Sequence, residues 1–131
     1  MNISFTIPLA PVTKKNSQQI FTNKKTGKPF IAPSRKFLDY EALAMFYLPR
    51  VSTIDVAVNV KCLFYMPTAR RVDLTNLLEA IDDIMVKAGL LADDSFTVIE
   101  SHDGSRVLYD KEKPRTEVYI TPAAGNTENV E

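Results

Sequence analysis

The sequence has very little of the chemistry on which several large protein classes depend. Its 131 residues include one cysteine, Cys62, one histidine, His102, and no tryptophan. A single cysteine excludes an internal disulfide framework and a cysteine-rich zinc site, and it fits a reducing compartment. The four glycines are scattered along the chain, so there is no glycine-rich phosphate-binding loop. We therefore expect no nucleotide cofactor.

Long hydrophobic runs are also missing. No apolar stretch approaches the roughly 20 residues that span a bilayer, and the first residues lack the basic-then-apolar layout of a secretory signal. We therefore expect no membrane partner and a cytoplasmic location. The length suits one domain with a single core. We place this domain at residues 1–122 and expect the small, polar and acidic segment 123–131 to be disordered.

The net charge of zero conceals an uneven distribution of charge along the chain. Residues 1–50 carry eight basic and two acidic side chains, a sum of +6, so residues 51–131 carry −6. The segment 73–103 alone holds eight acids against one lysine, Lys87. Such asymmetry indicates a nucleic-acid partner or a site that handles a polyanion, although solvated surface charge would give the same pattern.

Hydrophobic periodicity predicts both strands and helices. Apolar residues alternate with polar ones, or lie between turn residues, in six predicted strands: 2–7, 18–23, 28–32, 54–66, 96–100 and 116–121. Helical spacing predicts one helix from a Ser34 cap to about residue 48, and a second from Asp73 to the terminating Gly89. Cys62 falls on the apolar face of its strand and is expected in the core. These elements predict an α+β or mixed α/β domain with one mixed β-sheet and two main helices.

Carboxylates are the remaining candidates for catalysis. Asp73 begins the second helix, and Asp93 and Asp94 follow its far end. A helix of this length is about 22 Å long, so Asp73 and Asp94 converge only if the returning strand runs back beside the strand that leads into Asp73, or if a second subunit supplies one of them. Such oxygen ligands suit Mg²⁺. Equally, Asp73 can act as a helix cap, Asp93-Asp94 as a turn, and Asp82-Asp83 as a solvated helix face.

Several parts of the sequence carry a resemblance to a known family. The central parts are Arg70-Arg71-Val72-Asp73-Leu74-Thr75-Asn76-Leu77-Leu78-Glu79-Ala80, Asp82, Lys87-Ala88-Gly89 and Asp93-Asp94-Ser95. Together with the proline-rich, asparagine-containing segment 2–16, they resemble the RusA family of Holliday junction resolvases. The late segments 101–106 and 114–117 are similar to the prophage-type branch of that family.

The resemblance implies a RusA-like homodimer that resolves four-way DNA junctions by paired symmetric nicks in recombination and repair. The implied cofactor is Mg²⁺, with Mn²⁺ as a substitute. Two alternatives remain. One is a RusA-like protein that binds junction DNA but is impaired in catalysis, and the other is a metal-binding or protein-interaction domain whose acidic cluster is only surface.

The family's site residues carry over with two departures. Its first and third catalytic aspartates match Asp73 and Asp94, but the second falls on Thr75, and a functional lysine falls on Glu79. Because side chains four residues apart meet on a helix, Glu79 can restore the carboxylate missing at Thr75. Asp103 is a further candidate metal ligand beside Asp73 and Asp94. The expected DNA-binding residues are Lys14, Lys15, Asn16, Arg70, Arg71 and Asn76.

Three lysines and the single histidine each allow two interpretations. Lys24, Lys25 and Lys28 hold DNA or simply solvate a hairpin. His102 acts as a proton carrier or has a structural or surface role.

Overall fold

The computed structural model describes residues 1–14 and 18–123. Its elements, in chain order, are β1 (Ile3–Ile7), β2 (Gln18–Thr22), β3 (Pro29–Pro33), α1 (Arg35–Ala44), a 3₁₀ turn (Met45–Tyr47), β4 (Val58–Met66), α2 (Leu74–Lys87), β5 (Ile99–Ser101), β6 (Arg106–Tyr109) and β7 (Arg115–Pro122). Within these residues no helix is long and apolar enough to cross a membrane. The expected disordered segment lies outside the described residues from position 124 onward.

Five strands of the described chain form one mixed sheet in the order β1-β7-β4-β5, with β6 also paired to β4. β7 is antiparallel to both β1 and β4. β5 and β6 both run parallel to β4. β5 pairs with the first residues of β4, and β6 pairs with its last residues. Helix α2 therefore connects two parallel strands, as such a connection requires. The α+β prediction is confirmed.

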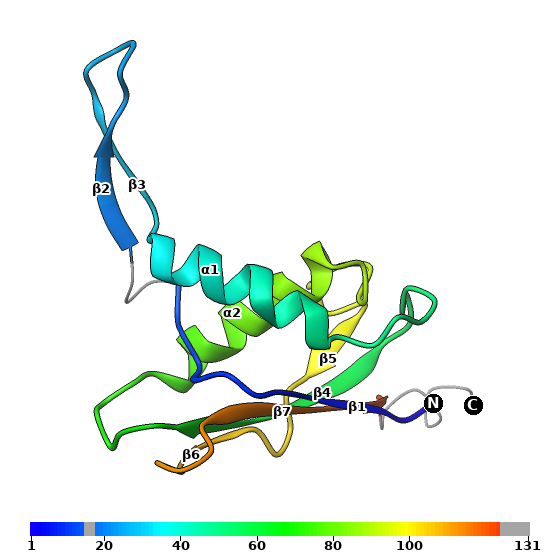
Figure 1. Ribbon diagram of the computed structural model, residues 1–131. Helices are drawn as coiled ribbons and strands as arrows, with labels where there is room; N and C mark the ends of the chain where they lie inside the picture. Colours follow the sequence, from blue (N-terminus) through cyan, green and yellow to red (C-terminus); the bar gives the residue numbers. More distant parts are fainter. Residues whose placement is uncertain (15–17, 124–131) are drawn as a thin grey trace.

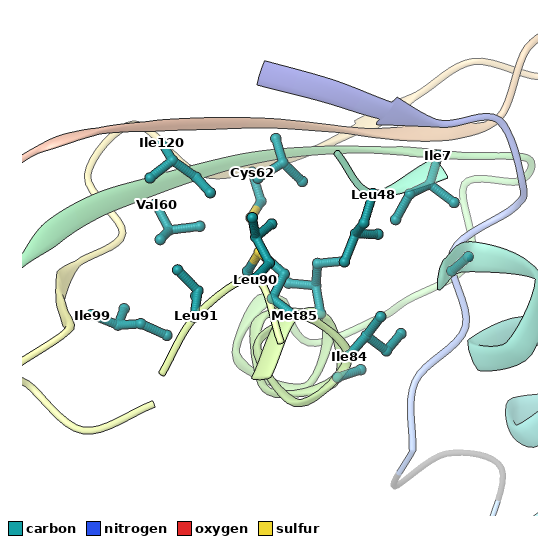
Figure 2. Packing of buried hydrophobic residues seen from close by; sticks show 14 of the residues in the cluster. Ile7, Leu48, Val60, Cys62, Ile84, Met85, Leu90, Leu91, Ile99 and Ile120 are labelled. Atoms are coloured by element: carbon teal, nitrogen blue, oxygen red, sulfur yellow. The ribbon is translucent and has the colours of Figure 1, made fainter. Parts of the chain in front are cut away.

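Both helices lie over the same face of this sheet (Figure 1). Alternate residues of β4 and β7 point into the space between sheet and helices and are buried: Val58, Val60, Cys62, Phe64, Thr116, Val118 and Ile120. Figure 2 shows Ile84 and Met85 of α2 lying close to this layer. Cys62 is a core residue, as expected, and burial raises the pKa of its thiol, which therefore remains protonated.

Two polar contacts fix the helices. The hydroxyl of Ser34 accepts a hydrogen bond from the Phe37 N–H at 3.3 Å, which confirms the predicted cap of α1. At the other end of the layer, Lys87 of α2 donates to the buried carboxylate of Glu41 on α1 at 2.7 Å. The contact between Lys87 and Glu41 thus ties the end of α2 to α1, in addition to the packing of the core.

Several predicted boundaries were wrong. The strand predicted at 54–66 begins only at Val58, because Ile54 forms an isolated bridge with Leu91 and leaves Val56 exposed. The first helix ends at Ala44 and continues as the 3₁₀ turn. The strand predicted at 96–100 begins at Ile99, since a turn precedes it in which the N–H groups of Val98 and Ile99 both donate to the Ser95 carbonyl. The short strand β6 was not predicted.

Candidate active site

One polar face of α2 lines a cavity of about 320 Å³. The helix contributes Thr75, Leu78, Glu79 and Asp82, which follow the i, i+3, i+4, i+7 spacing of a single helix face. Asp94, from the loop after α2, and His102, from the turn after β5, complete the lining. Side chains from three separate parts of the chain thus meet in one hollow.

The path of the chain after α2 brings Asp94 to this cavity. Gly89 ends the helix with a positive φ of 81°, which a residue without a Cβ adopts readily. The buried side chains of Leu90 and Leu91 then anchor the chain. The backbone N–H groups of these two leucines both donate to the Met85 carbonyl. The chain then leads toward β5, which pairs with the start of β4 and not with the end of β4 that leads into Asp73. Asp94 thus lines the cavity, whereas Asp73 does not.

Asp93 shapes the turn that presents Asp94. Its carboxylate accepts a hydrogen bond from the Asp94 N–H at 2.8 Å. Hydrogen bonds from the Ser95 side chain and from the Asp94 backbone lower the pKa of Asp93. The two adjacent aspartates therefore differ in role: Asp93 holds the turn, and Asp94 lines the cavity.

Asp82 and His102 form a hydrogen-bonded pair in the cavity wall. His102 Nε2 lies 2.9 Å from Asp82 Oδ2 and 3.1 Å from Oδ1. Asp82 is only 8% exposed, so the interpretation of Asp82 as part of a solvated helix face was wrong. Burial raises the pKa of Asp82, the hydrogen bond and charge of His102 oppose this, and the neighbouring Asp83 and Asp94 raise it further.

The turn that carries His102 is fixed by the side chain of Asn59 on β4. Asn59 Oδ1 accepts hydrogen bonds from the Asp103 N–H, at 2.7 Å, and from the Ser101 hydroxyl, while its Nδ2 donates to the Asp103 carbonyl. Gly104 has a φ of +87°, and a Cβ there would lie 2.7 Å from Lys61 Cδ. The turn is therefore built for one conformation, which directs His102 toward α2.

The raised pKa of Asp82 predicts a pH-dependent stability difference. A folded-state pKa above the unfolded value means that the contribution of Asp82 to stability falls as pH rises through the folded pKa. We expect the stability of Asp82→Asn to depend less on pH, so that the stability of wild type relative to Asp82→Asn falls as pH rises above about 4. Urea unfolding of both proteins measures this, and a constant difference would contradict it.

The structure brings together only some of the predicted site residues. Thr75, Glu79 and Asp94 share the cavity, but Asp73 and Asp103 are not among its lining residues. Asp73 stands at the N-cap position of α2 without a side-chain bond to the helix backbone, and its Oδ2 accepts from Asn76 Nδ2 at 3.4 Å. It precedes Asp82 by nine residues, about 13 Å of helix. In the part of the chain that the structure describes, no three His, Cys, Asp or Glu side chains cluster as preformed metal ligands.

A second hollow, a basic groove of about 440 Å³, is lined by residues that precede Thr75 in the sequence. Three of its lining side chains are cationic, Lys36, Arg70 and Arg71, and none is acidic; the others are Ala10, Pro11, Val12, Thr13, Met66, Pro67, Thr68 and Val72. Lys36 comes from α1 and was not singled out in the sequence, because its proximity to Arg70 depends on how the helices pack. Such a groove is suited to phosphate groups.

The other predicted DNA-binding residues have different surroundings. Lys14 Nζ lies 3.0 Å from Asp83 Oδ2 on α2, so it ties the N-terminal segment to that helix. Asn76 is half-buried beside Asp73. Lys15 and Asn16 lie outside the described residues.

Comparisons with known proteins indicate the family of this chain. The family model described as endodeoxyribonuclease RusA matches residues 8–121, which include all six residues that line the cavity. The chain is also similar to the crossover junction endodeoxyribonuclease RusA of Aquifex aeolicus (strain VF5). The two are 30% identical over 105 residues, which cover 78% of this chain and 79% of the relative.

Proposed function

Because this chain belongs to the RusA family of endodeoxyribonucleases, we propose that it resolves Holliday junctions by two symmetric nicks. The observation that carries this proposal is the meeting of Thr75, Glu79 and Asp94 in one cavity. The last residue that lines the basic groove is Val72, three residues before Thr75 in the sequence. The residues proposed to bind phosphate are therefore close in the sequence to those of the acidic cavity. A DNA backbone held by Arg70 and Arg71 would reach this acidic cavity.

The donors in the cavity fit a hard divalent cation. Glu79 and Asp94 offer carboxylate oxygens and Thr75 a hydroxyl oxygen, while no sulfur ligand lines the cavity. Mg²⁺ commonly takes one or two protein carboxylates and completes its shell with water and substrate phosphate, so a cluster of three acidic ligands is unnecessary. We propose Mg²⁺, with Mn²⁺ as a substitute, held by Glu79 and Asp94. When bound, such an ion lowers the pKa of a water molecule and neutralises charge on the phosphodiester.

The residues of the chain divide the remaining work. Arg70, Arg71 and Lys36 hold the phosphate backbone, and Thr75 orients water or phosphate at the cavity through its hydroxyl group. Asp82 fixes the imidazole of His102 in the cavity wall, where it can exchange a proton with bound water. Hydrolysis by in-line attack of water on phosphorus then needs no covalent enzyme intermediate.

Two symmetric nicks require two identical sites. A homodimer with two-fold symmetry supplies them, because each subunit then places the same cavity against one of two equivalent strands. We therefore propose a homodimer as the active form. Asp73 and Asp103 remain proposed metal ligands only if substrate binding brings their carboxylates to the cavity.

A second candidate function is junction binding without efficient cleavage. It is favoured by the replacement of a family aspartate by Thr75 and of a family lysine by Glu79, and by the lack of three preformed ligands among the described residues. Such a protein would bind junctions with a strong dependence on salt, since phosphate contacts dominate its affinity.

Cleavage assays separate these functions. The protein is incubated with an end-labelled synthetic four-way junction and with duplex DNA of matching sequence, in Mg²⁺ and in EDTA. Resolution predicts paired nicks in opposite strands of the junction only with Mg²⁺, while the duplex remains intact. Salt-sensitive binding without nicks would support the second function, and the absence of binding would contradict both.

A further inference from the structure

The β2–β3 hairpin extends away from the layer of helices and sheet as a separate arm (Figure 1). Its two strands pair only with each other within the described residues. A two-stranded ribbon is at best marginally stable in water by itself. This arm, which comprises residues 18–33, therefore presents surface that a binding partner would stabilise.

Both faces of the arm are apolar. Ile20 lies directly opposite Ile31, and Phe21 opposite Phe30, so the two pairs point to opposite faces. Ile20 is 76% and Ile31 66% exposed, while the Phe21 and Phe30 rings stack with centroids 5.7 Å apart. The isoleucine pair thus forms an exposed apolar face of the ribbon. The stacked phenylalanine pair on the opposite face stiffens the ribbon.

The charge of the arm indicates which kind of partner it binds. Its turn carries Lys24, Lys25 and Lys28, all exposed, and the first acidic residue of the chain is Asp39. The Asn23 side chain accepts from the N–H groups of Lys25 and Thr26, which orders this turn. A ribbon with three cations, no anions and bare isoleucines complements a polyanion that also offers apolar faces.

We propose that this arm inserts at the branch point of the four-way junction. The lysines at its tip bind backbone phosphates, and Ile20 and Ile31 pack against the bases where stacking is interrupted. Apolar side chains such as isoleucine act as wedges between base steps in other DNA-binding proteins. The arm then makes the protein prefer a junction over a duplex, because a duplex has no interrupted stack. This inference rests on the proposed function and adds the element that recognises the substrate's shape.

The wedge is tested with Ile20→Thr/Ile31→Thr, which keeps β-branched residues in the strands. We expect junction affinity to fall about tenfold, the order of one lost base contact, while duplex affinity is unchanged. A 2-aminopurine at the branch point should change fluorescence on binding wild type and not on binding the variant. Leu43→Thr/Phe46→Thr, which alters exposed apolar residues of α1 and its 3₁₀ turn, is the matched control and should bind as wild type.

The lysines are tested independently with Lys24→Gln/Lys25→Gln. Each lost phosphate contact should reduce the slope of log affinity against log salt concentration by about 1. Lys111→Gln/Lys113→Gln removes the same charge from an exposed loop elsewhere and should leave the slope unchanged. Circular dichroism confirms that each variant is folded.

Four outcomes distinguish the alternatives. Selective loss of junction binding in the arm variants supports the proposal. Equal binding by wild type and arm variants overturns it while leaving the proposed function intact. Dissociation of a dimer by Ile20→Thr/Ile31→Thr in sedimentation analysis overturns it in favour of a self-association arm. If wild type binds no junction, the proposed function fails and the inference with it.

Discussion

Asp94→Asn should abolish most junction cleavage while leaving junction binding intact. Asp94 is the acidic residue that the returning chain brings to the polar face of α2. Loss of its charge removes one of the two carboxylates proposed to hold the cation, whose stabilisation of the transition state amounts to several kcal/mol. We therefore expect a rate decrease of about 100- to 1,000-fold. Single-turnover cleavage and gel-shift binding, measured on the same labelled junction, separate chemistry from affinity.

Asp93→Asn is the matched control for this experiment. Asp93 is adjacent and exposed, and an asparagine oxygen can still accept the hydrogen bond from the Asp94 N–H. We expect cleavage within about threefold of wild type. A tenfold decrease would require the activation free energy to rise by about 1.4 kcal/mol, and this substitution alters neither proposed metal ligand. If Asp93→Asn and Asp94→Asn lost activity equally, the assignment of Asp94 to the reaction and Asp93 to the turn would be wrong.

Glu79→Gln should also reduce cleavage strongly, by about 10- to 100-fold if one carboxylate ligand is lost. The cavity contains Glu79 together with Thr75, the position to which the family resemblance assigns an aspartate. The two positions are one helical turn apart, so their side chains reach the same space. Glu79 can thus supply the charge that Thr75 lacks. Single-turnover rates for Glu79→Gln measure this contribution.

A compensating substitution makes this hypothesis specific. Adding Thr75→Asp to Glu79→Gln places a carboxylate on the same helix face one turn earlier, and cleavage should recover at least partly. Glu100→Gln, which removes an exposed acid on β5, should have no effect. Full activity of Glu79→Gln alone would contradict the compensation between positions 75 and 79.

Local patterns in the sequence predicted much of the fold. The alternation in β4 and β7 and the 3.6-residue period of α2 identified the buried faces correctly. Boundaries were less accurate where nonlocal contacts decide them. Ile54 is apolar and alternates with its neighbours, but its partner is Leu91, so the strand pattern does not continue there. The exposed Leu43 and Phe46 show likewise that apolar spacing alone does not indicate burial.

The site was only partly predictable for the same reason. Asp94, Glu79 and Thr75 were singled out from motifs, and the structure places all three in one cavity. Asp82 was assigned to solvent because it lies with Glu79 and Asp83 on the helix face opposite the apolar residues, and nothing local shows that His102 returns over it. The spacing of residues 75, 79 and 82 on one helix face was a usable signal. The position of His102 depends on Asn59, which is 43 residues earlier.

The cavity lined by Thr75, Glu79 and Asp94 is the proposed catalytic metal site. Titration of the isotope-labelled protein with Mn²⁺, followed by paramagnetic broadening of backbone amide signals in NMR, tests this without relying on activity. We predict saturable broadening that is strongest at residues 75, 79 and 94 and is lost in Asp94→Asn. Broadening centred on Asp73 or Asp103, and unaffected by Asp94→Asn, would contradict the claim.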